Sequence, residues 1–403
     1  MNAVGSWLIV MISIALVHSV RVDSSLFFKK KRCDPKCTVT QSNFTDFPSE
    51  CQTVCADIYI DENCDLSENQ LTSLFKNMKH LIGSLVVNGT KLTSGKFLAG
   101  LETIVTDHYD IVWTNNHEMV ELGLSNLSVI DCRRLEISKN SKMADLGLLN
   151  LQTALSSSNT ASYVWLEIYK LSDNFCMPFD QMEIFLTIHN LNLAYVKANY
   201  CEPTKSDDAR IHGDVIINSN SNFDNMKSVK AIFGSLIING TDLENLDFLK
   251  SLKYIAPLES TDDEIKSLII CNNPNLINIM LPSLKVKHFL ISSSQSLQLL
   301  HRNRIRTDKF FAIQISGNNE ELMYDSKSCY QLQNSLHKIY RASINGNSCE
   351  AIEYKEKRRI MEWKAAMVKD FSFIVIGMSL VGMILLTCIV FWLKRYRTVR
   401  PVK

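Results

Sequence analysis

A short pattern recurs along most of this chain and limits the folds that the chain can adopt. It reads apolar-x-apolar-x-x-Asn, with Thr or Ser replacing Asn in some copies, and successive copies within each half are 21–32 residues apart. One short strand per 20–30 residues is typical of a solenoid, because each rung buries its apolar residues only when the next rung stacks on it. Scattered strands explain so regular a pattern poorly. Nine clear copies begin at Ile58, Leu85, Ile111, Leu135, Val215, Leu236, Leu268, Phe289 and Ile313.

Two segments within this pattern are closely similar. Residues 82–104 and 233–255 are identical at eleven of 23 positions without a gap. The chain is therefore expected to contain a duplicated domain, with the seam near Cys176. In each copy, the polar residue three places after the second apolar one is expected to turn inward and satisfy backbone groups where the strand bends.

The N-terminal end of the chain predicts secretion. Residues 7–17 are almost wholly apolar, which is the length of a signal-peptide core and too short to span a bilayer. Val17 and Ser19 place small residues before a cleavage point, so we expect a signal peptide over residues 1–19. An uncleaved N-terminal anchor is the alternative.

The C-terminal end predicts a membrane span. Residues 371–393 contain no charge, which matches the roughly 20 residues needed to cross hydrocarbon. The following ten residues, 394–403, carry five basic residues and no acidic ones, and such charge stays on the cytoplasmic side. We expect a single-pass type I protein of the plasma membrane with its N-terminus outside. The densely charged residues 350–370 form a stalk in this interpretation, and a buried core helix is the alternative to the span.

Eleven of the 12 cysteines precede the expected span, where an oxidising compartment favours disulfides. Two isolated pairs, Cys176 with Cys201 and Cys329 with Cys349, have the spacing of local links. The number eleven is odd, so at least one thiol is expected to stay free or to pair with another chain. Zinc is the alternative for the first four cysteines, but no His lies near them. Sequence leaves open the pairing of Cys33, Cys37, Cys51, Cys55, Cys64, Cys132 and Cys271.

Four Asn-x-Ser/Thr sequons predict glycosylation of an extracellular surface, at Asn43, Asn88, Asn126 and Asn239. The 43 Lys and Arg residues nearly balance the 42 Asp and Glu residues, which argues against nucleic-acid binding. No catalytic, phosphate-binding, dinucleotide-binding or metal-binding motif is present, so we expect no enzyme activity, no cofactor and no metal.

The two five-rung halves, their leading cysteines and the shared G-S-L-x-x-N-G-T-x-L segment resemble the receptor L-domains of the insulin and epidermal growth factor receptor families. The resemblance covers roughly residues 33–349. It implies a β-rich α/β solenoid made of two tandem right-handed β-helices, similar to leucine-rich repeats. It also implies that Cys176 and Cys201 cap the second domain at its start, that Cys329 and Cys349 cap it at its end, and that Cys37 and Cys64 have the spacing of a first cap. The implied domains are L-domain 1 at 33–172 and L-domain 2 at 176–349.

The chain also departs from those receptors. About 40 residues separate the two halves, which leaves no room for the cysteine-rich furin-like module found between the receptor L-domains. A tail of ten residues cannot hold a kinase. We therefore expect a kinase-less transmembrane L-domain protein.

Strand alternation predicts which residues face outward and could bind a ligand. The outward column of the first half is mixed, whereas that of the second half is aliphatic, and Trp165 and Gln314 are their expected fifth members. Packing between the two domains, or strand propensity alone, would produce similar columns. The predicted ligand-binding residues are Tyr59, Val86, Val112 and Glu136, followed by Ile216, Ile237, Ile269 and Leu290.

The sequence favours a non-catalytic surface protein whose two domains bind an extracellular polypeptide, either insulin-like or growth-factor-like. Such a protein would act as a decoy, a co-receptor or a modulator. The alternative is adhesion, in which the same faces pair with another copy or with another L-domain protein.

Overall fold

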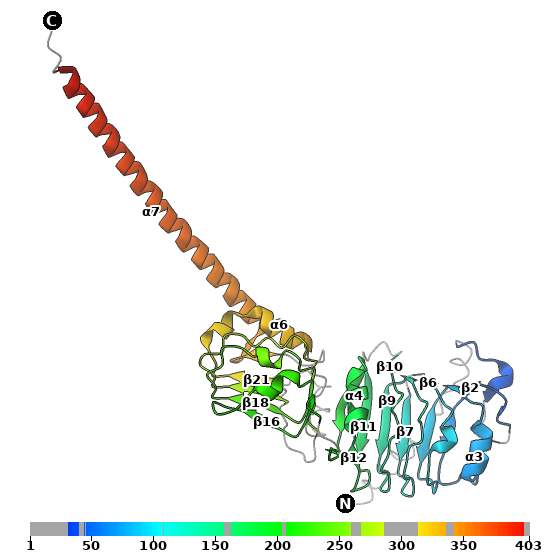
Figure 1. Cartoon of the computed structure of the whole chain (residues 1–403). Coiled ribbons are helices and arrows are strands. Elements are labelled where there is room, and N and C mark those ends of the chain that lie inside the picture. Colours follow the sequence, from blue (N-terminus) through cyan, green and yellow to red (C-terminus); the bar gives the residue numbers. More distant parts are fainter. Residues whose placement is uncertain are drawn as a thin grey trace, which may run out of the picture.

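The computed structural model describes residues 31–39, 44, 46–107, 109–156, 163–203, 207–258, 267–285, 313–335 and 342–398. These residues form two β-rich halves that lie side by side and one long helix that leaves the second half (Figure 1). The expected signal peptide, Asn43, Leu290 and the end of the predicted tail lie outside the described residues.

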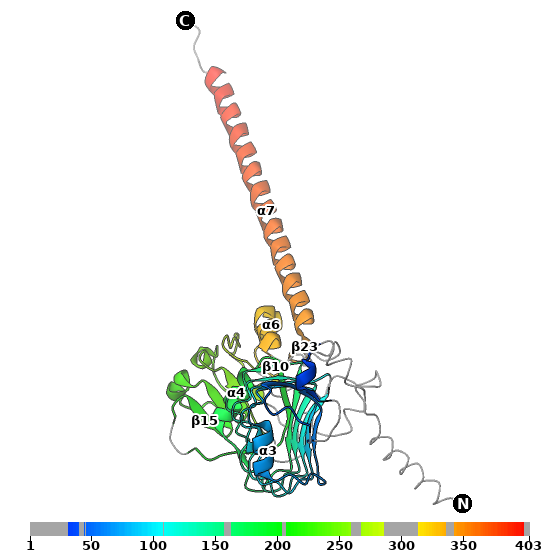
Figure 2. The ribbon, with the colours of Figure 1, turned by 90° about the vertical axis from the view of Figure 1, so that its right-hand side faces the viewer.

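The first half contains two six-stranded parallel sheets, and the chain alternates between them. We call the sheet that carries the predicted column the first front sheet, and the other the first back sheet. Seen from the end that carries α3, the strands lie behind one another (Figure 2). The front sheet is β3 (Ile58–Ile60), β5 (Leu85–Asn88), β7 (Asp110–Thr114), β9 (Arg134–Ser138), β11 (Val164–Tyr169) and β13 (Leu191–Val196); the back sheet is β1 (Thr38–Val39), β2 (Thr53–Ala56), β4 (His80–Ile82), β6 (Thr103–Val105), β8 (Val129–Asp131) and β10 (Thr153–Leu155).

The second half repeats this arrangement with fewer strands. Its six-stranded sheet, here the second front sheet, is parallel except for its last pair of strands. Its strands are β16 (Val215–Ile217), β18 (Leu236–Asn239), β20 (Leu268–Cys271), β21 (Ile313–Ser316), β22 (Ser343–Ile344) and β23 (Asn347–Ser348), and the smaller sheet is β15 (Arg210–His212), β17 (Ala231–Phe233) and β19 (Tyr254–Ile255).

Short helices connect or cap these strands, and each half has its own apolar core. In β5, Leu85 and Val87 are buried whereas Val86 between them is partly exposed, as strand alternation requires. The α-helices are α3 (Glu68–Phe75), α4 (Phe179–Thr187), α6 (Ser326–Ser335) and α7 (Cys349–Thr398), and the 3-10 helices are η1 (Pro35–Cys37), η2 (Lys96–Leu98), η3 (Asp224–Ser228), η4 (Asp247–Leu249) and η6 (Glu320–Tyr324).

The glycine of the duplicated segment lies where the chain passes closest to the preceding rung. A Cβ atom at Gly83 would lie 2.0 Å from the carbonyl oxygen of Ala56, and one at Gly234 would lie 2.2 Å from that of Gly213. Any side chain would therefore push neighbouring rungs apart, which explains why both copies of the segment carry glycine here.

A ladder of buried polar side chains connects successive rungs of the first half. Asn116 Nδ2 donates to the carbonyl of Val87 (3.0 Å), and its Oδ1 accepts from the backbone and hydroxyl of Thr90. Asn140 repeats this arrangement one rung later, donating to the carbonyl of Trp113 (2.9 Å) and accepting from the backbone of Asn116 (2.9 Å). The expected inward turn of the repeat's polar residue is confirmed at these positions.

The second half has the same ladder. Asn273 Nδ2 donates to the carbonyl of Ile238 (3.2 Å), and Asn318 Nδ2 donates to the carbonyl of Ile270 (2.9 Å). Asn273 Oδ1 accepts from the backbone of Thr241 (2.9 Å). The ladder begins only at the second rung of each half, because Asn63 and Asn220 in the first rungs are exposed.

The expected rung that begins at Phe289 lies outside the described residues. Within them, β20 pairs with β21, so that Ile269 lies opposite Gln314, the expected fifth member of the second column.

The segment around Cys176 belongs to both halves, whereas the sequence analysis assigned it to the second half alone. β13 pairs with β11 and so extends the first front sheet. On the other side, Phe179 stacks on Phe233 with ring centroids 4.3 Å apart, and Tyr200 donates to the carbonyl of Ala256 (2.6 Å). The small sheet of β12 (Cys176–Met177) and β14 (Asn199–Tyr200) lies within this joint.

Four disulfides lie in the described part of the chain: Cys33–Cys55, Cys37–Cys51, Cys176–Cys201 and Cys329–Cys349. The spacing of Cys37 and Cys64 does not correspond to a pair, since Cys37 bonds to Cys51 and Cys64 is a free thiol. Cys64, Cys132 and Cys271 remain thiols, and burial raises the pKa of the Cys132 thiol well above its usual range.

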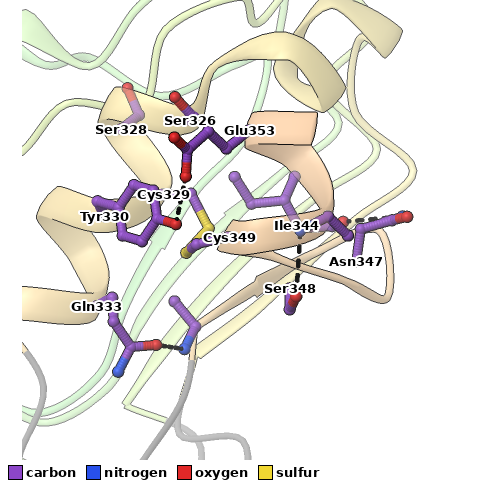
Figure 3. The surroundings of a disulfide bond; sticks show 12 residues. Ser326, Ser328, Cys329, Tyr330, Gln333, Ile344, Asn347, Ser348, Cys349 and Glu353 are labelled. Atoms are coloured by element: carbon purple, nitrogen blue, oxygen red, sulfur yellow. Dashed lines mark hydrogen bonds between the residues drawn. A yellow bond between two sulfur atoms is a disulfide. The ribbon is translucent and has the colours of Figure 1, made fainter. Parts of the chain in front are cut away.

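The helix α7 is anchored to the second half at its start. Cys329 of α6 bonds to Cys349 at the first turn of α7, and Tyr330 donates to Glu353 (2.7 Å; Figure 3). Further along α7, Arg359 forms two hydrogen bonds with Glu321 and lies 4.4 Å from the ring centroid of Tyr324. By length and composition, α7 is long and apolar enough to cross a membrane.

We predict that Asn116→Leu strongly destabilises the first half. The substitution conserves volume but removes the amide that donates to the carbonyl of Val87 and leaves the buried backbone N–H of Thr90 without this partner, which costs about 3 kcal/mol in all. Thermal unfolding of the full-length protein in detergent should show a transition roughly 6–12 °C lower.

Asn220→Leu is the matched control, because Asn220 has the same place in the repeat but is exposed. Its unfolding transition should stay within about 2 °C of the parent protein. Equal losses in the two variants would contradict the structural role assigned to the ladder.

Candidate functional site

The predicted column of the first half lies in register across the first front sheet. Tyr59 lies opposite Val86, Val86 opposite Val112, and Val112 opposite Glu136. Tyr59, on the edge strand β3, is 48% exposed, and the other three are partly exposed. The structure therefore brings all four predicted residues together on one face.

The fifth member of this column is Glu167, and Trp165 was the wrong expectation. Glu167 lies opposite Glu136, whereas Trp165 lies opposite Arg134, one step earlier on the strands. The error is two residues, so both side chains are on the outward side of β11. The copy of the repeat around Leu166 and Ile168 matches the pattern only weakly. The sequence therefore did not distinguish Glu167 from Trp165 as the residue opposite Glu136.

Two further rows flank the column. Asp110 lies opposite Arg134 toward the starts of the strands, and Asn88 lies opposite Thr114 toward their ends. Because residues two apart on a strand share a face, the three rows together form one continuous surface. We call this surface the first face.

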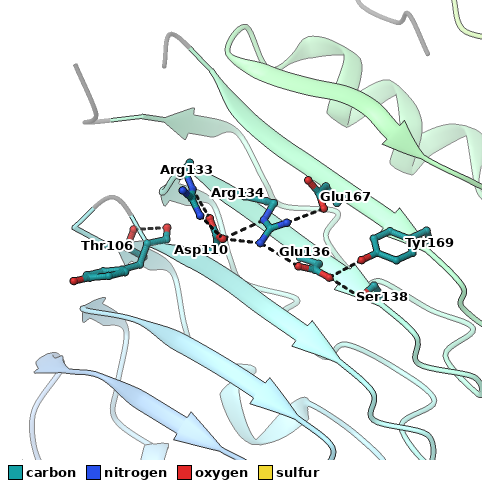
Figure 4. A network of polar contacts seen from close by, with 9 residues as sticks. Thr106, Asp110, Arg133, Arg134, Glu136, Ser138, Glu167 and Tyr169 are labelled. Carbon is teal, nitrogen blue, oxygen red and sulfur yellow. Dashed lines mark hydrogen bonds and ion pairs between the residues drawn. The ribbon is translucent and has the colours of Figure 1, made fainter. Parts of the chain in front are cut away.

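Arg134 lies at the centre of an ion network on the first face (Figure 4). Its Nη2 lies 2.7 Å from Asp110 Oδ2 and 3.4 Å from Glu136 Oε2, and its Nη1 lies 3.1 Å from Glu167 Oε2. Arg133 adds a paired contact to Asp110, with nitrogen–oxygen distances of 3.0 and 2.8 Å. Three carboxylates thus share two guanidinium groups, which leaves the network with one net negative charge.

The second oxygen of Glu136 is held by hydroxyl groups. Glu136 Oε1 accepts from Ser138 Oγ and from Tyr169 OH, each at 2.8 Å. Ser138 also contacts Thr114 at 2.9 Å. These bonds fix the side chain of a predicted binding residue in one orientation, so little side-chain entropy remains to be lost when a ligand binds.

The network also shifts proton affinities. Burial raises the pKa of Glu167, and the guanidinium of Arg134 partly opposes that rise. Burial alone would lower the pKa of Arg134, but its ion pairs with Asp110 and Glu167 outweigh burial and raise it. Arg134 is therefore the group that limits the rise in the pKa of Glu167 on this partly buried surface.

Aromatic side chains border the network. Trp165 lies edge-on to Tyr163, with ring centroids 5.0 Å apart, and 5.4 Å from Tyr195. At the opposite end of the column, an open cavity of about 880 Å³ lies beside Tyr59, between the loop after β3 and α3. The cavity is lined on one side by Asp61 and Asp65. Aromatic and acidic groups therefore occur at both ends of the first face.

The second column is aliphatic, as predicted, at the three of its positions that the structure describes up to Ile269. Ile216 lies opposite Ile237, which lies opposite Ile269. Ile216 on the edge strand β16 is 62% exposed, and the other two are partly exposed. Leu290 lies outside the described residues. We call the surface of these three isoleucines the second face.

The sequence analysis did not identify Asp110, Arg134 or Glu167 as parts of the site. Their outward phase could have been found by extending the alternation two residues on each side of the column. Their mutual contacts could not, because these depend on the register of three strands that are far apart in sequence. Within the described ranges, no group of three or more His, Cys, Asp or Glu residues is placed to hold a metal ion.

A family model described as Receptor L domain matches residues 50–152 and 209–334. The two matches fall on the two β-rich halves and include all eight predicted ligand-binding residues. A search of curated proteins gave no match.

We predict that Arg134→Met raises the pKa of Glu167 further, because the nearest positive charge is removed. A carboxyl whose pKa is raised in the folded state binds its proton more tightly there than in the unfolded chain, so stability falls as pH rises between the two pKa values. The loss of thermal stability relative to the parent protein should therefore be larger near neutral pH than at about pH 5.

Arg133→Met is the control for this measurement. The Arg133 side chain is 57% exposed, and Asp110 keeps Arg134 as a partner when Arg133 is replaced. Its effect on stability should be small and nearly independent of pH. A flat pH dependence for Arg134→Met as well would contradict the assigned role of Arg134.

Proposed function

The chain belongs to the Receptor L domain family, and we propose that it is a non-catalytic cell-surface protein that binds an extracellular polypeptide through its first and second faces. The observation that carries the proposal is the register of Tyr59, Val86, Val112 and Glu136 on one pre-ordered surface. A mixed aromatic, aliphatic and charged patch of this kind suits protein recognition better than a bare hydrophobic patch does.

The charge of the first face indicates the chemistry of the ligand. The ion network carries one net negative charge, and Asp61 and Asp65 line the adjacent cavity. A polypeptide that presents basic side chains beside apolar ones would be complementary to this surface. We propose an insulin-like or growth-factor-like ligand, for which the protein acts as a decoy, co-receptor or modulator.

The same proposal includes the arrangement of the chain. The alternation of strands between two parallel sheets supports a right-handed β-helix in each half. The apolar part of α7, followed by basic residues 394–395, supports a single type I span in the plasma membrane with both halves outside. The disulfides support an oxidising extracellular location.

Adhesion is the second candidate, and the second face favours it. Three isoleucines in register, with Ile216 largely exposed, form an apolar strip that another copy could cover. The thiol of Cys271 follows Ile269 on the same strand and face. Light scattering on the full-length protein in detergent, at increasing concentration, distinguishes the two roles: a strict monomer counts against adhesion.

We predict that the double substitution Ile237→Asp/Ile269→Asp weakens ligand binding roughly 30-fold, because two charges must be desolvated at the contact. Surface display of the full-length chain should be unchanged, since both side chains are partly exposed. Binding is measured on cells with a panel of purified insulin-like and epidermal-growth-factor-like hormones. Glu136→Lys tests the first face in the same assay and should weaken binding of a basic ligand by a comparable factor.

Leu149→Asp is the matched control, because Leu149 is 56% exposed and lies outside both faces. It should bind like the parent protein. Equal binding of a ligand to the parent protein and to all the variants would contradict the assignment of the two faces as its binding surface.

A further inference from the structure

The sequons of the two duplicated segments are built into the polar ladders. Thr90, the hydroxyl residue of the Asn88 sequon, donates from Oγ1 to Asn116 Oδ1 at 2.9 Å and is 6% exposed. Thr241, the hydroxyl residue of the Asn239 sequon, donates to Asn273 Oδ1 at 2.7 Å and is 1% exposed. In both halves, the accepting asparagine comes from the next rung.

The asparagine of each sequon is also held by the next rung. Asn115 Nδ2 donates to Asn88 Oδ1 at 2.9 Å, and Asn272 Nδ2 donates to Asn239 Oδ1 at 3.0 Å. Asn115 and Asn272 both have positive φ, 56° and 55°, a conformation that asparagine tolerates well. Because the oxygen is held, the nitrogen is aimed away from the sheet, and both sequon asparagines are exposed.

The third described sequon differs from these two. Asn126 is exposed, but its Nδ2 donates to the carbonyl of Ala99 at 2.8 Å. Within the described ranges, Nδ2 of Asn88 and Nδ2 of Asn239 make no hydrogen bond. The nitrogen that receives a sugar is thus available in the two duplicated sequons, whereas the hydroxyl that accompanies it is not.

N-glycosylation needs both groups. A lipid-linked pyrophosphate oligosaccharide is the donor: a bond forms from the sugar C1 to Nδ2, the C1–oxygen bond to pyrophosphate breaks, the lipid pyrophosphate leaves, and one amide proton passes to solvent. Transfer requires Ser or Thr two residues after Asn, which means that the transferase must reach that hydroxyl. In the folded chain, the ladder occupies the hydroxyls of Thr90 and Thr241.

We propose that Asn88 and Asn239 are N-glycosylation sites that accept sugar only before the following rung folds over the sequon. The inference rests on the proposed extracellular location. Asn116 and Asn273 lie 26 and 32 residues after the sequon threonines, so each site closes when that length of further chain has folded. Afterwards, Asn115 and Asn272 hold the modified side chains and direct both glycans outward.

The two glycans would then border the proposed binding surfaces. Asn88 lies opposite Thr114 in the row at the strand ends of the first face, and Asn239 lies opposite Cys271 in the second front sheet. A ligand must therefore approach from the starts of the strands, where Asp110 and Arg134 lie. A glycan at Asn239 would also shield the thiol of Cys271 from a second chain.

The test compares folded and unfolded acceptor. Full-length chain is made without glycans and given to purified oligosaccharyltransferase with its lipid-linked donor, and site occupancy is read by mass spectrometry. Transfer to Asn88 and Asn239 should be on the order of 100-fold slower in the folded chain than in the reduced and alkylated chain, because the hydroxyl is exposed only by local unfolding. Only molecules whose buried Cys132 resists alkylation are scored as folded.

Asn222→Thr provides a control, since it makes Asn220 a sequon whose Asn and Thr both occupy exposed positions in the first rung of the second half. Asn220 in this variant should accept sugar in the folded chain as fast as in the unfolded one. Equally fast transfer to Asn88 or Asn239 in folded chain would overturn the proposal.

Expression of the same variant in secretory cells tests the sites in their natural setting. We expect Asn88, Asn239 and Asn220 all to carry glycans. Empty Asn88 and Asn239 beside a filled Asn220 would overturn this inference alone. A chain that is empty at all three positions would overturn the proposed extracellular location together with it.

Discussion

The hydrogen bonds of the buried asparagines hold this structure together. A chain that alternates between two parallel sheets must turn between strands, and each turn leaves backbone groups inside the molecule where water cannot reach them. Asn116, Asn140, Asn273 and Asn318 satisfy these groups, because one amide side chain donates to a carbonyl of the preceding rung and accepts from a backbone N–H of that same rung. The register of the front sheets, and hence the composition of each face, depends on these bonds.

The ladder has consequences on the outside of the molecule. Because it sets Leu85, Ile111 and Leu135 in line inside, it sets Val86, Val112 and Glu136 in line outside. The ion network around Arg134 then forms between side chains that three separate strands supply. The same ladder buries and hydrogen-bonds the hydroxyls of Thr90 and Thr241. In the proposal above, folding of the core therefore sets the time at which Asn88 and Asn239 can be glycosylated.

The segment that joins the two halves packs against both of them. Residues 176–203 extend the first front sheet through β13 and cover the second half with Phe179 and Tyr200. Arg210 reinforces the joint through Asp180 and Glu183 of α4, at 2.7 and 2.9 Å. In the sequence, the repeats place the boundary between the two halves at this segment, because the segment does not match the repeat. In the structure, the segment packs against both halves.

Sequence alone determined the elements whose cause is local. The alternation of apolar residues, the inward polar residue and the duplicated G-S-L segment predict the strands, their faces and two similar halves, because each follows from the chemistry of a few adjacent residues. Only the tertiary structure decided which strands are neighbours. It placed Glu167 rather than Trp165 beside Glu136, paired β20 with β21, and joined Cys37 to Cys51. Which pairing forms depends on the difference in free energy between alternative registers of whole strands. Residues far apart in sequence contribute to that difference together, so no short stretch of sequence determines the pairing.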